Sequence, residues 1–183
     1  RMFACILAPT SGTVTMDGAP VMEGGRKAGT RIQTVFQDPF ASLDPRMRVG
    51  DIVAEGPLAH GLTTKSARVA YVAGHLSRQR LGLARALSTR PELIVCDEPV
   101  SALDVAIQAQ ILNLMSDLQK ELGLTYLFIS HDLSVVRHLS DRIAIMLNGR
   151  IVEEGVTETV YETPQDDYTK RLLAAVPKLS AAA

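Results

Sequence analysis

The chain has 183 residues, which suits one domain with a sizeable buried core. Its 19 basic and 20 acidic residues nearly cancel, so no charge excess points to nucleic acid or to a polybasic membrane contact. No apolar run approaches the ~18 residues that a membrane-spanning helix needs. The two cysteines, Cys5 and Cys96, show no motif spacing, which argues against disulfide or metal roles and is consistent with a reducing cytosol.

In the first half of the chain, the pattern predicts short strands and two helices. Gly12 to Gly18 alternates and ends in Asp-Gly, as a hairpin strand does. Arg31 to Phe36 is expected to form the next strand. Asp51 to Leu58 is expected to be helical, as is Gln79 to Ser88, which stops before Pro91.

Two apolar runs in the second half end abruptly in polar side chains. Leu93 to Cys96 leads into Asp97 and Glu98, and Tyr126 to Ile129 leads into Ser130 and His131. Apolar runs of this length are typical of buried parallel strands, with Cys96 as a small buried hydrophobe. Because ligands bind at the carboxyl edge of open α/β sheets, these polar residues are expected to face one crevice.

Helical spacing dominates the rest of the second half. Val105 to Leu122 predicts a helix with Asp104 as its N-cap and Gly123 as its C-terminal stop. Leu133 to Leu139 predicts a short helix. Asn148-Gly149 predicts a tight turn. The remaining expected elements are strands at Arg142 to Leu147 and Arg150 to Glu154, then helices at Thr157 to Thr163 and Gln165 to Ala175 with Pro164 between them.

The polar groups after the two runs suit phosphoryl transfer to water. Asp97 at a strand terminus can hold Mg²⁺, and Glu98 can orient or deprotonate a water molecule. His131 can reach a terminal phosphate or the same water. An isolated acidic pair is more often only a polar exit from a strand, and a lone histidine is more often structural. The combination, in this order and behind apolar runs, favours the catalytic interpretation.

These motifs carry a family resemblance. The segment from Leu81 to Pro177 resembles the second half of an ATP-binding-cassette (ABC) transporter ATPase. Within it, Leu93 to Glu98 resembles the Walker B strand with its catalytic glutamate, Ser101 to Asp104 the D-loop, and His131 the switch histidine. Upstream, Val35-Phe36-Gln37-Asp38-Pro39 resembles the Q-loop.

Three further segments are similar to the oligopeptide/dipeptide importer branch: Phe40 to Arg46, Cys96 to Val105, and Tyr168 to Pro177. The resemblance implies an α/β, P-loop NTPase-like fold, with a parallel sheet and flanking helices. It implies that residues 1–183 form one partial nucleotide-binding domain. Within that domain, about 47–90 would be a shortened helical subdomain and 157–183 a C-terminal helical extension.

The resemblance also assigns roles to individual residues. Asp97 and Gln37 would hold Mg²⁺, Glu98 would act as general base, and His131 would sense the γ-phosphate of ATP. Gln37 would also couple the nucleotide site to the membrane subunits. Ser77 would offer a hydroxyl to ATP held by the opposing subunit, and Asp104 would contact that subunit besides capping its helix.

ATP and Mg²⁺ are therefore the expected ligands. The expected partners are transmembrane permease subunits of an ABC importer and a second ABC ATPase subunit, in a homodimer or heterodimer, with no nucleic acid. The expected location is cytoplasmic, peripheral on the inner face of the cell membrane.

The sequence departs from the family pattern in three places. It contains no G-x-x-x-x-G-K-[ST], so the loop that cradles phosphates is missing, and the chain is expected to begin just downstream of it. Leu76-Ser77 runs straight into Arg78, where relatives carry Gly-Gly-Gln. The linker Thr63 to Gly74 is short. The chain alone is therefore expected not to hydrolyse ATP appreciably.

Two alternatives stay open. One is a non-enzymatic, truncated or decayed fragment that at most pairs with intact ABC subunits. The other is an ABC-type ATPase of DNA repair or translation without a membrane partner, against which the Tyr168 to Pro177 ending argues. No chemistry is expected of His60, His75 or His138, and Arg85 is expected to lie on a solvated helix face.

Overall fold

The computed structural model describes residues 9–23, 26–35, 46–67, 81–101 and 103–175. The chain divides into two compact units, Arg1–Ile129 and Ser130–Ala183, and each is described by itself. We call them the first and the second unit. The expectation of one partial nucleotide-binding domain over 1–183, subdivided at about 47–90 and at 157–183, stays a prediction.

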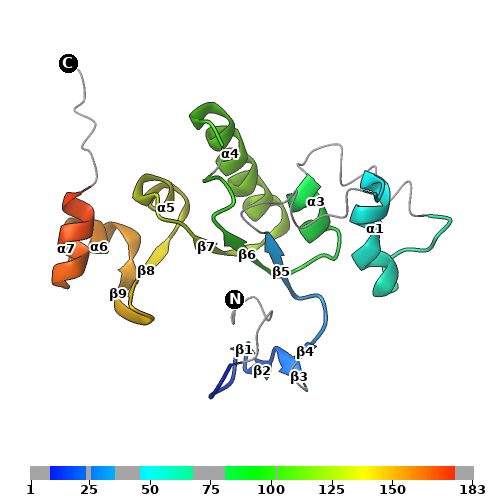
Figure 1. The fold of residues 1–183 in the computed structure, drawn as a ribbon, viewed down its shortest axis with the longest axis horizontal. Helices are drawn as coiled ribbons and strands as arrows, with labels where there is room; N and C mark the ends of the chain where they lie inside the picture. The colour runs from blue at the N-terminus through cyan, green and yellow to red at the C-terminus, as the bar shows by residue number, and fades with distance from the viewer. Residues whose placement is uncertain (1–8, 24–25, 36–45, 68–80, 102, 176–183) are drawn as a thin grey trace. The chain divides into compact units, whose positions relative to one another are not determined.

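A three-stranded parallel sheet forms the centre of the first unit (Figure 1). Its order is β5 (Ile32–Val35), β6 (Leu93–Asp97) and β7 (Thr125–Ile129). Parallel pairing confirms that the two apolar runs are neighbouring strands with their carboxyl ends at one edge. The middle strand, β6, is the most buried, which explains its uninterrupted apolar sequence.

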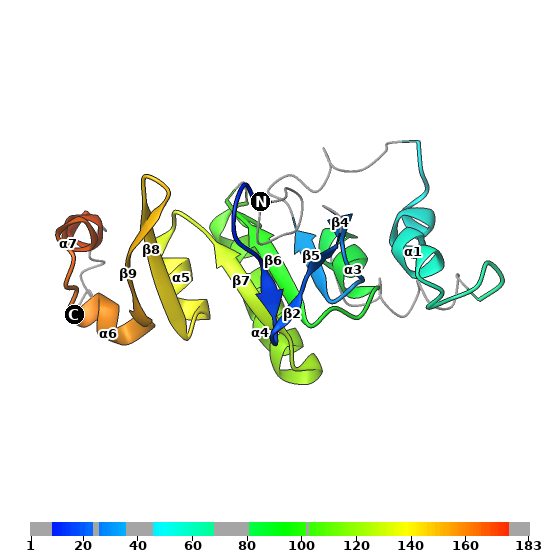
Figure 2. The ribbon, with the colours of Figure 1, turned by 90° about the horizontal axis from the view of Figure 1, so that it is seen from below.

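The two faces of this sheet are covered by different elements. Val95 packs with Val21 and Ile32 in a core under four short strands. Because side chains alternate along a strand, Ile94 and Cys96 point to the opposite face, where α4 lies (Figures 1 and 2). The short strands pair as two antiparallel hairpins, β1 (Thr15–Met16) with β2 (Ala19–Pro20) and β3 (Met22–Glu23) with β4 (Arg26–Lys27).

The first hairpin is shorter than its sequence pattern suggests. Asp17 and Gly18 form the predicted turn, with φ of 52° and 77°. Two consecutive positive φ values define the tight turn that suits the twist of antiparallel strands. The strand before the turn covers only Thr15–Met16, although alternation begins at Gly12, so periodicity overestimated its length.

Three described helices belong to the first unit: α1 (Val49–Ala59), α3 (Leu81–Leu87) and α4 (Val105–Leu122). Helices α1 and α3 bury small side chains against each other, with Val53, Ala54 and Ala84 fully buried. Helix α4 has the predicted ends. The Asp104 carboxylate accepts from the Ile107 N–H at 2.9 Å, and Gly123 adopts the left-handed conformation at φ 65°.

The second unit is a hairpin packed with helices (Figure 2). Its core combines Val136, Ile143, Ile145 and Val160. Asn148 and Gly149 form the predicted turn, with φ of 49° and 79°. The elements are α5 (Leu133–Leu139), β8 (Arg142–Leu147), β9 (Arg150–Val156), α6 (Thr157–Glu162) and α7 (Asp167–Ala174).

Helix α7 begins two residues later than the sequence pattern indicates. The Asp166 carboxylate accepts from the Tyr168 and Thr169 N–H groups and so acts as the N-cap. The Gln165 N–H instead donates to Glu153 at 2.8 Å, which holds the preceding turn to β9. Among the described residues, no helix combines the length and the apolar character that crossing a bilayer requires.

Candidate functional site

The carboxyl end of β6 carries the two candidate carboxylates. Asp97 is the last residue of the strand and lies opposite Ile129, the last residue of β7. Cys96 and Val95 before it are buried, whereas Asp97 and Glu98 are half-buried. The buried part of the strand therefore ends at Cys96, and the next residue, Asp97, is partly accessible to solvent. It lies at the sheet edge where the sequence predicted a ligand site.

Glu98 turns the chain sharply at this edge. Its φ is 48°, in the left-handed region that residues with a Cβ seldom adopt. Its N–H donates to the Ile129 carbonyl at 3.0 Å, so the conformation is held by β7. Its carbonyl accepts from the Ser101 N–H at 3.3 Å and the Ser101 hydroxyl at 3.1 Å. These bonds fix the position from which the Glu98 side chain leaves the backbone.

A short anchored loop joins this turn to α4. Val100 is buried, with 3% of its surface exposed, and its carbonyl accepts from the Leu103 N–H at 3.1 Å. Asp104 then caps α4, as predicted. Losing such a cap costs about 1 kcal/mol. The segment from Asp97 to Asp104 thus bonds to β7 near its start and leads directly into α4, the longest described helix, at its end.

The Cys96 thiol, next to Asp97 in sequence, is buried. Cys96 is fully buried in β6, as its place in the apolar run predicted, and burial raises the pKa of its thiol to about 12. Burial, and then the neighbouring Cys96, likewise raise the pKa of Tyr126 on β7. The raised pKa of the buried thiol disfavours the thiolate, which is the form of cysteine that acts as a nucleophile or metal ligand.

Of the other predicted site residues, one lies in the second unit and two lie outside the described residues. His131 is exposed and belongs to the second unit, so its convergence with Glu98 stays a prediction. Near it, the Ser130 hydroxyl accepts from the Asp132 N–H at 3.0 Å, and Asp132 caps α5. Gln37 and Ser77 lie outside the described residues.

The described residues contain no group of three or more histidines, cysteines or carboxylates that could hold a metal ion by itself. That arrangement is compatible with Mg²⁺, which usually takes one or two protein carboxylates and completes its shell with water and substrate phosphates. A half-buried carboxylate at a strand end, such as Asp97, fits this need. Residues 1–101 match a protein-family model described as ABC transporter.

The chain belongs to the ABC transporter family. It is 45% identical to a putative peptide import ATP-binding protein of Brucella ovis, over 94% of this chain and 62% of that protein. It is 47% identical to the oligopeptide transport ATP-binding protein OppF of Bacillus subtilis, over 92% of this chain and 64% of that protein. This member thus spans less than two thirds of either relative.

A solved structure supports the same assignment. The chain is similar to cbiO1 of Clostridium perfringens, described as part of the ABC transporter complex cbiONQ. The TM-score is 0.72 at 26% identity, covering 88% of this chain and 72% of that one. Together with the parallel sheet and flanking helices, this likeness confirms the predicted ABC ATPase fold.

One group of residues was missed by the sequence patterns. A cleft in the first unit is lined by Lys27, Gln33, Glu55, His60 and Arg85, among others. No motif marks them, because they come from four elements spread over more than fifty positions. Only the fold brings them together.

Proposed function

We propose that this ABC family member is the ATP-binding subunit of a bacterial importer for peptides, of the dipeptide and oligopeptide type. The observation that carries the proposal is the Asp97–Glu98 pair at the carboxyl edge of a parallel sheet, where the Glu98 backbone bonds to Ile129 of β7 and to Ser101. The Brucella ovis and Bacillus subtilis relatives supply the peptide class, because their names refer to peptide and oligopeptide transport.

In this proposal Asp97 and Glu98 have different roles. Asp97 would hold Mg²⁺, with Gln37 as a further ligand, and the ion would supply charge stabilisation to the phosphates of ATP. Glu98 accepts a proton from the attacking water, and its fixed backbone aims the carboxylate. His131 contacts the γ-phosphate, and Gln37 links the site to the membrane subunits.

The partners follow from the same assignment. Two ATPase subunits, alike or different, would pair, with Asp104 and Ser77 facing the opposing subunit. Transmembrane permease subunits would bind the pair on the inner face of the cell membrane. Co-purification with permease subunits tests this, whereas their absence from the complex would favour an ABC ATPase of DNA repair or translation.

We further propose that the 183-residue chain alone does not turn over ATP. Its sequence lacks the glycine-rich loop and lysine that hold the phosphates, and each lost charge-assisted hydrogen bond is worth about 1.5–3 kcal/mol. Isothermal titration with Mg·ATP tests this. Micromolar binding would contradict it, and its absence would leave the alternative of a non-enzymatic chain that pairs with intact ABC subunits.

A chimera tests the acidic pair independently of that question. The matching region of the Bacillus subtilis relative is replaced by this whole chain, and the rest of the relative is kept. We expect Glu98→Gln to lower turnover by roughly 10²–10⁴-fold, the usual contribution of a general base. Asp117→Asn, which removes an exposed carboxylate of α4, is the matched control.

The outcomes separate the two functions. Turnover that survives Glu98→Gln would overturn the role of Glu98. A chimera that folds and binds Mg·ATP but shows no turnover would support the non-enzymatic alternative.

A further inference from the structure

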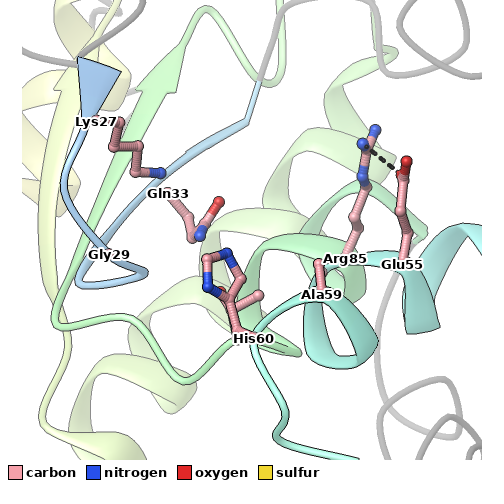
Figure 3. A pocket seen from close by; sticks show the side chains of 9 residues that line it. Lys27, Gly29, Gln33, Glu55, Ala59, His60 and Arg85 are labelled. Carbon is pink, nitrogen blue, oxygen red and sulfur yellow. Dashed lines mark hydrogen bonds and ion pairs between the residues drawn. The ribbon is translucent and has the colours of Figure 1, made fainter. Parts of the chain in front are cut away.

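A cleft lies in the first unit, and neither Asp97 nor Glu98 lines it. It is an open cleft of about 360 Å³ between β4, β5, α1 and α3 (Figure 3). Gln33 on its wall lies opposite Ile94 in the sheet register, three residues before Asp97. At about 3.3 Å per residue, this separates the two positions by roughly 10 Å along the strand. The cleft therefore belongs to the amino-terminal part of the sheet.

Hydrogen-bond donors dominate its wall. Figure 3 shows the Lys27 ammonium, the Gln33 amide and the His60 ring arranged along one side. The Gln33 side-chain N–H donates to the Thr30 carbonyl at 3.4 Å, a long bond that leaves the second amide N–H to other acceptors. An ammonium has three donors, so Lys27 can serve a ligand in addition to another partner.

The charges on the wall are unequal. Arg85 and Glu55 form an ion pair with a nitrogen–oxygen distance of 3.1 Å, seen on the other side in Figure 3. Arg85 keeps further N–H donors, because this contact uses one of five. Among the described residues that line the cleft, two are cations, Lys27 and Arg85, and one is a carboxylate, Glu55. A lining with more cations than carboxylates among these residues, and with several N–H donors, suits an anionic ligand.

The cleft is closely packed where α1 meets the residues that follow α3. A Cβ built on Gly56 of α1 would lie 2.8 Å from the Thr89 methyl, so the backbone and this side chain are already in close contact. The Thr89 hydroxyl donates to the Ala86 carbonyl at 3.1 Å, which fixes its rotamer. A preformed wall costs less to order on binding than a mobile one.

We propose that this cleft binds a small oxyanion, a carboxylate or a phosphate group, through Lys27, Gln33, His60 and Arg85. Its volume lies at the small end of the range for ligand sites, which favours a compact ligand. The proposal goes beyond the ATP-binding function and does not depend on it, because none of these residues lies at the Asp97 edge.

Titration of the full chain tests the site, with inorganic phosphate and succinate as separate probes at constant ionic strength set by sodium chloride. Binding is read from amide chemical shifts of β5, α1 and α3. We expect saturable binding of at least one probe, and the stronger one identifies phosphate or carboxylate as the preferred group. Lys27→Gln should weaken it by at least roughly tenfold, the scale of one charge-assisted hydrogen bond.

A second variant, which should strengthen binding instead of weakening it, makes the test more specific. Glu55→Gln removes the only carboxylate among the residues named here and should tighten binding by roughly fivefold, on the scale of one nearby charge at the surface. Lys120→Gln removes an exposed lysine of α4 and should change nothing. Circular dichroism verifies that each variant is folded.

Three outcomes would overturn the proposal. In the first, neither probe saturates above the chloride background. In the second, neither Lys27→Gln nor Glu55→Gln changes the affinity. Shift changes at the carboxyl ends of β6 and β7, with none at β5, α1 or α3, would place the anion at the other edge of the sheet. The first two results leave the ATP-binding proposal unchanged, since its tests use Mg·ATP and Glu98.

Discussion

The two ends of the central sheet place polar residues in different ways. At the carboxyl end, Asp97 and Glu98 are adjacent in sequence, and the bonds that position them come from the next few residues and from the end of β7. At the amino end, the cleft gathers side chains from four separate elements. A site built from neighbouring residues leaves a pattern in the sequence, whereas one built by packing leaves none.

Both ends depend on β6, so its core side chains should affect them together. Ile94 is completely buried in the middle strand. We expect Ile94→Ala to lower the free energy of unfolding of the first unit by about 2–5 kcal/mol, through lost burial and the cavity left behind. Hydrogen exchange of the β6 and β7 amides measures the effect on this unit alone.

Leu127→Ala on β7 is the control, because 37% of the Leu127 surface is exposed and less burial is lost. A similar cost for both variants would show that β6 is not the buried centre of the sheet. Loss of hydrogen-exchange protection at only one end of β6 would show that the two sites do not both depend on the packing of this strand.

The helices and the second hairpin could be predicted closely because their signals are local. Helices α4 and α5 have the expected bounds, since Asp104, Asp132 and Gly123 mark their ends through short-range backbone bonds. The Asn148-Gly149 turn fixed the second hairpin in the same way.

The other features depend on distant residues. The start of α7 depends on Glu153 of another element, and the lengths of the first short strands depend on packing of Val21 under the sheet. The acidic pair could be located from sequence, but the left-handed backbone of Glu98 could not. That conformation is held by a hydrogen bond to Ile129, and this bond depends on the register of β6 and β7, which the sequence patterns did not predict.

Gly56 tests whether close helix packing shapes the amino-terminal cleft. An added methyl would meet the buried Thr89 side chain at 2.8 Å. Overpacking should lower the free energy of unfolding by about 1–3 kcal/mol. The higher helix propensity of alanine should offset at most ~1 kcal/mol of this, so we expect Gly56→Ala to be destabilising. Urea unfolding measures the change.

Thr89→Ser in the Gly56→Ala background removes the methyl group and keeps the hydroxyl, so it should restore most of the loss. Stabilisation by Gly56→Ala alone would mean that α1 and α3 are not in tight contact at this point. Turnover of the chimera, which depends on the other end of the sheet, should be unchanged by a well-folded double variant.

Lowering the pH should destabilise the amino end of the central sheet more than the carboxyl end, by less than the substitutions above. At the amino end, the Arg31 guanidinium donates to both Glu92 oxygens at 2.7 Å and joins the starts of β5 and β6. These hydrogen bonds, with the charge of Arg31, lower the pKa of Glu92 below its ordinary value of 4.5. At the carboxyl end, the corresponding tie is the backbone bond from Glu98 to Ile129, which does not titrate.

A carboxyl whose pKa is lower in the folded state stabilises the fold fully at pH values well above 4.5 and loses that contribution as the pH falls through the folded pKa. Protection of the β5 amides should therefore fall between pH 6 and pH 3 more in the native chain than in Glu92→Gln. Both groups are exposed, so the difference should be small and should shrink further at high salt. An equal loss in the two proteins would show that the pair does not hold this end of the sheet, and the amino end would then depend on packing and backbone bonds, as the carboxyl end does.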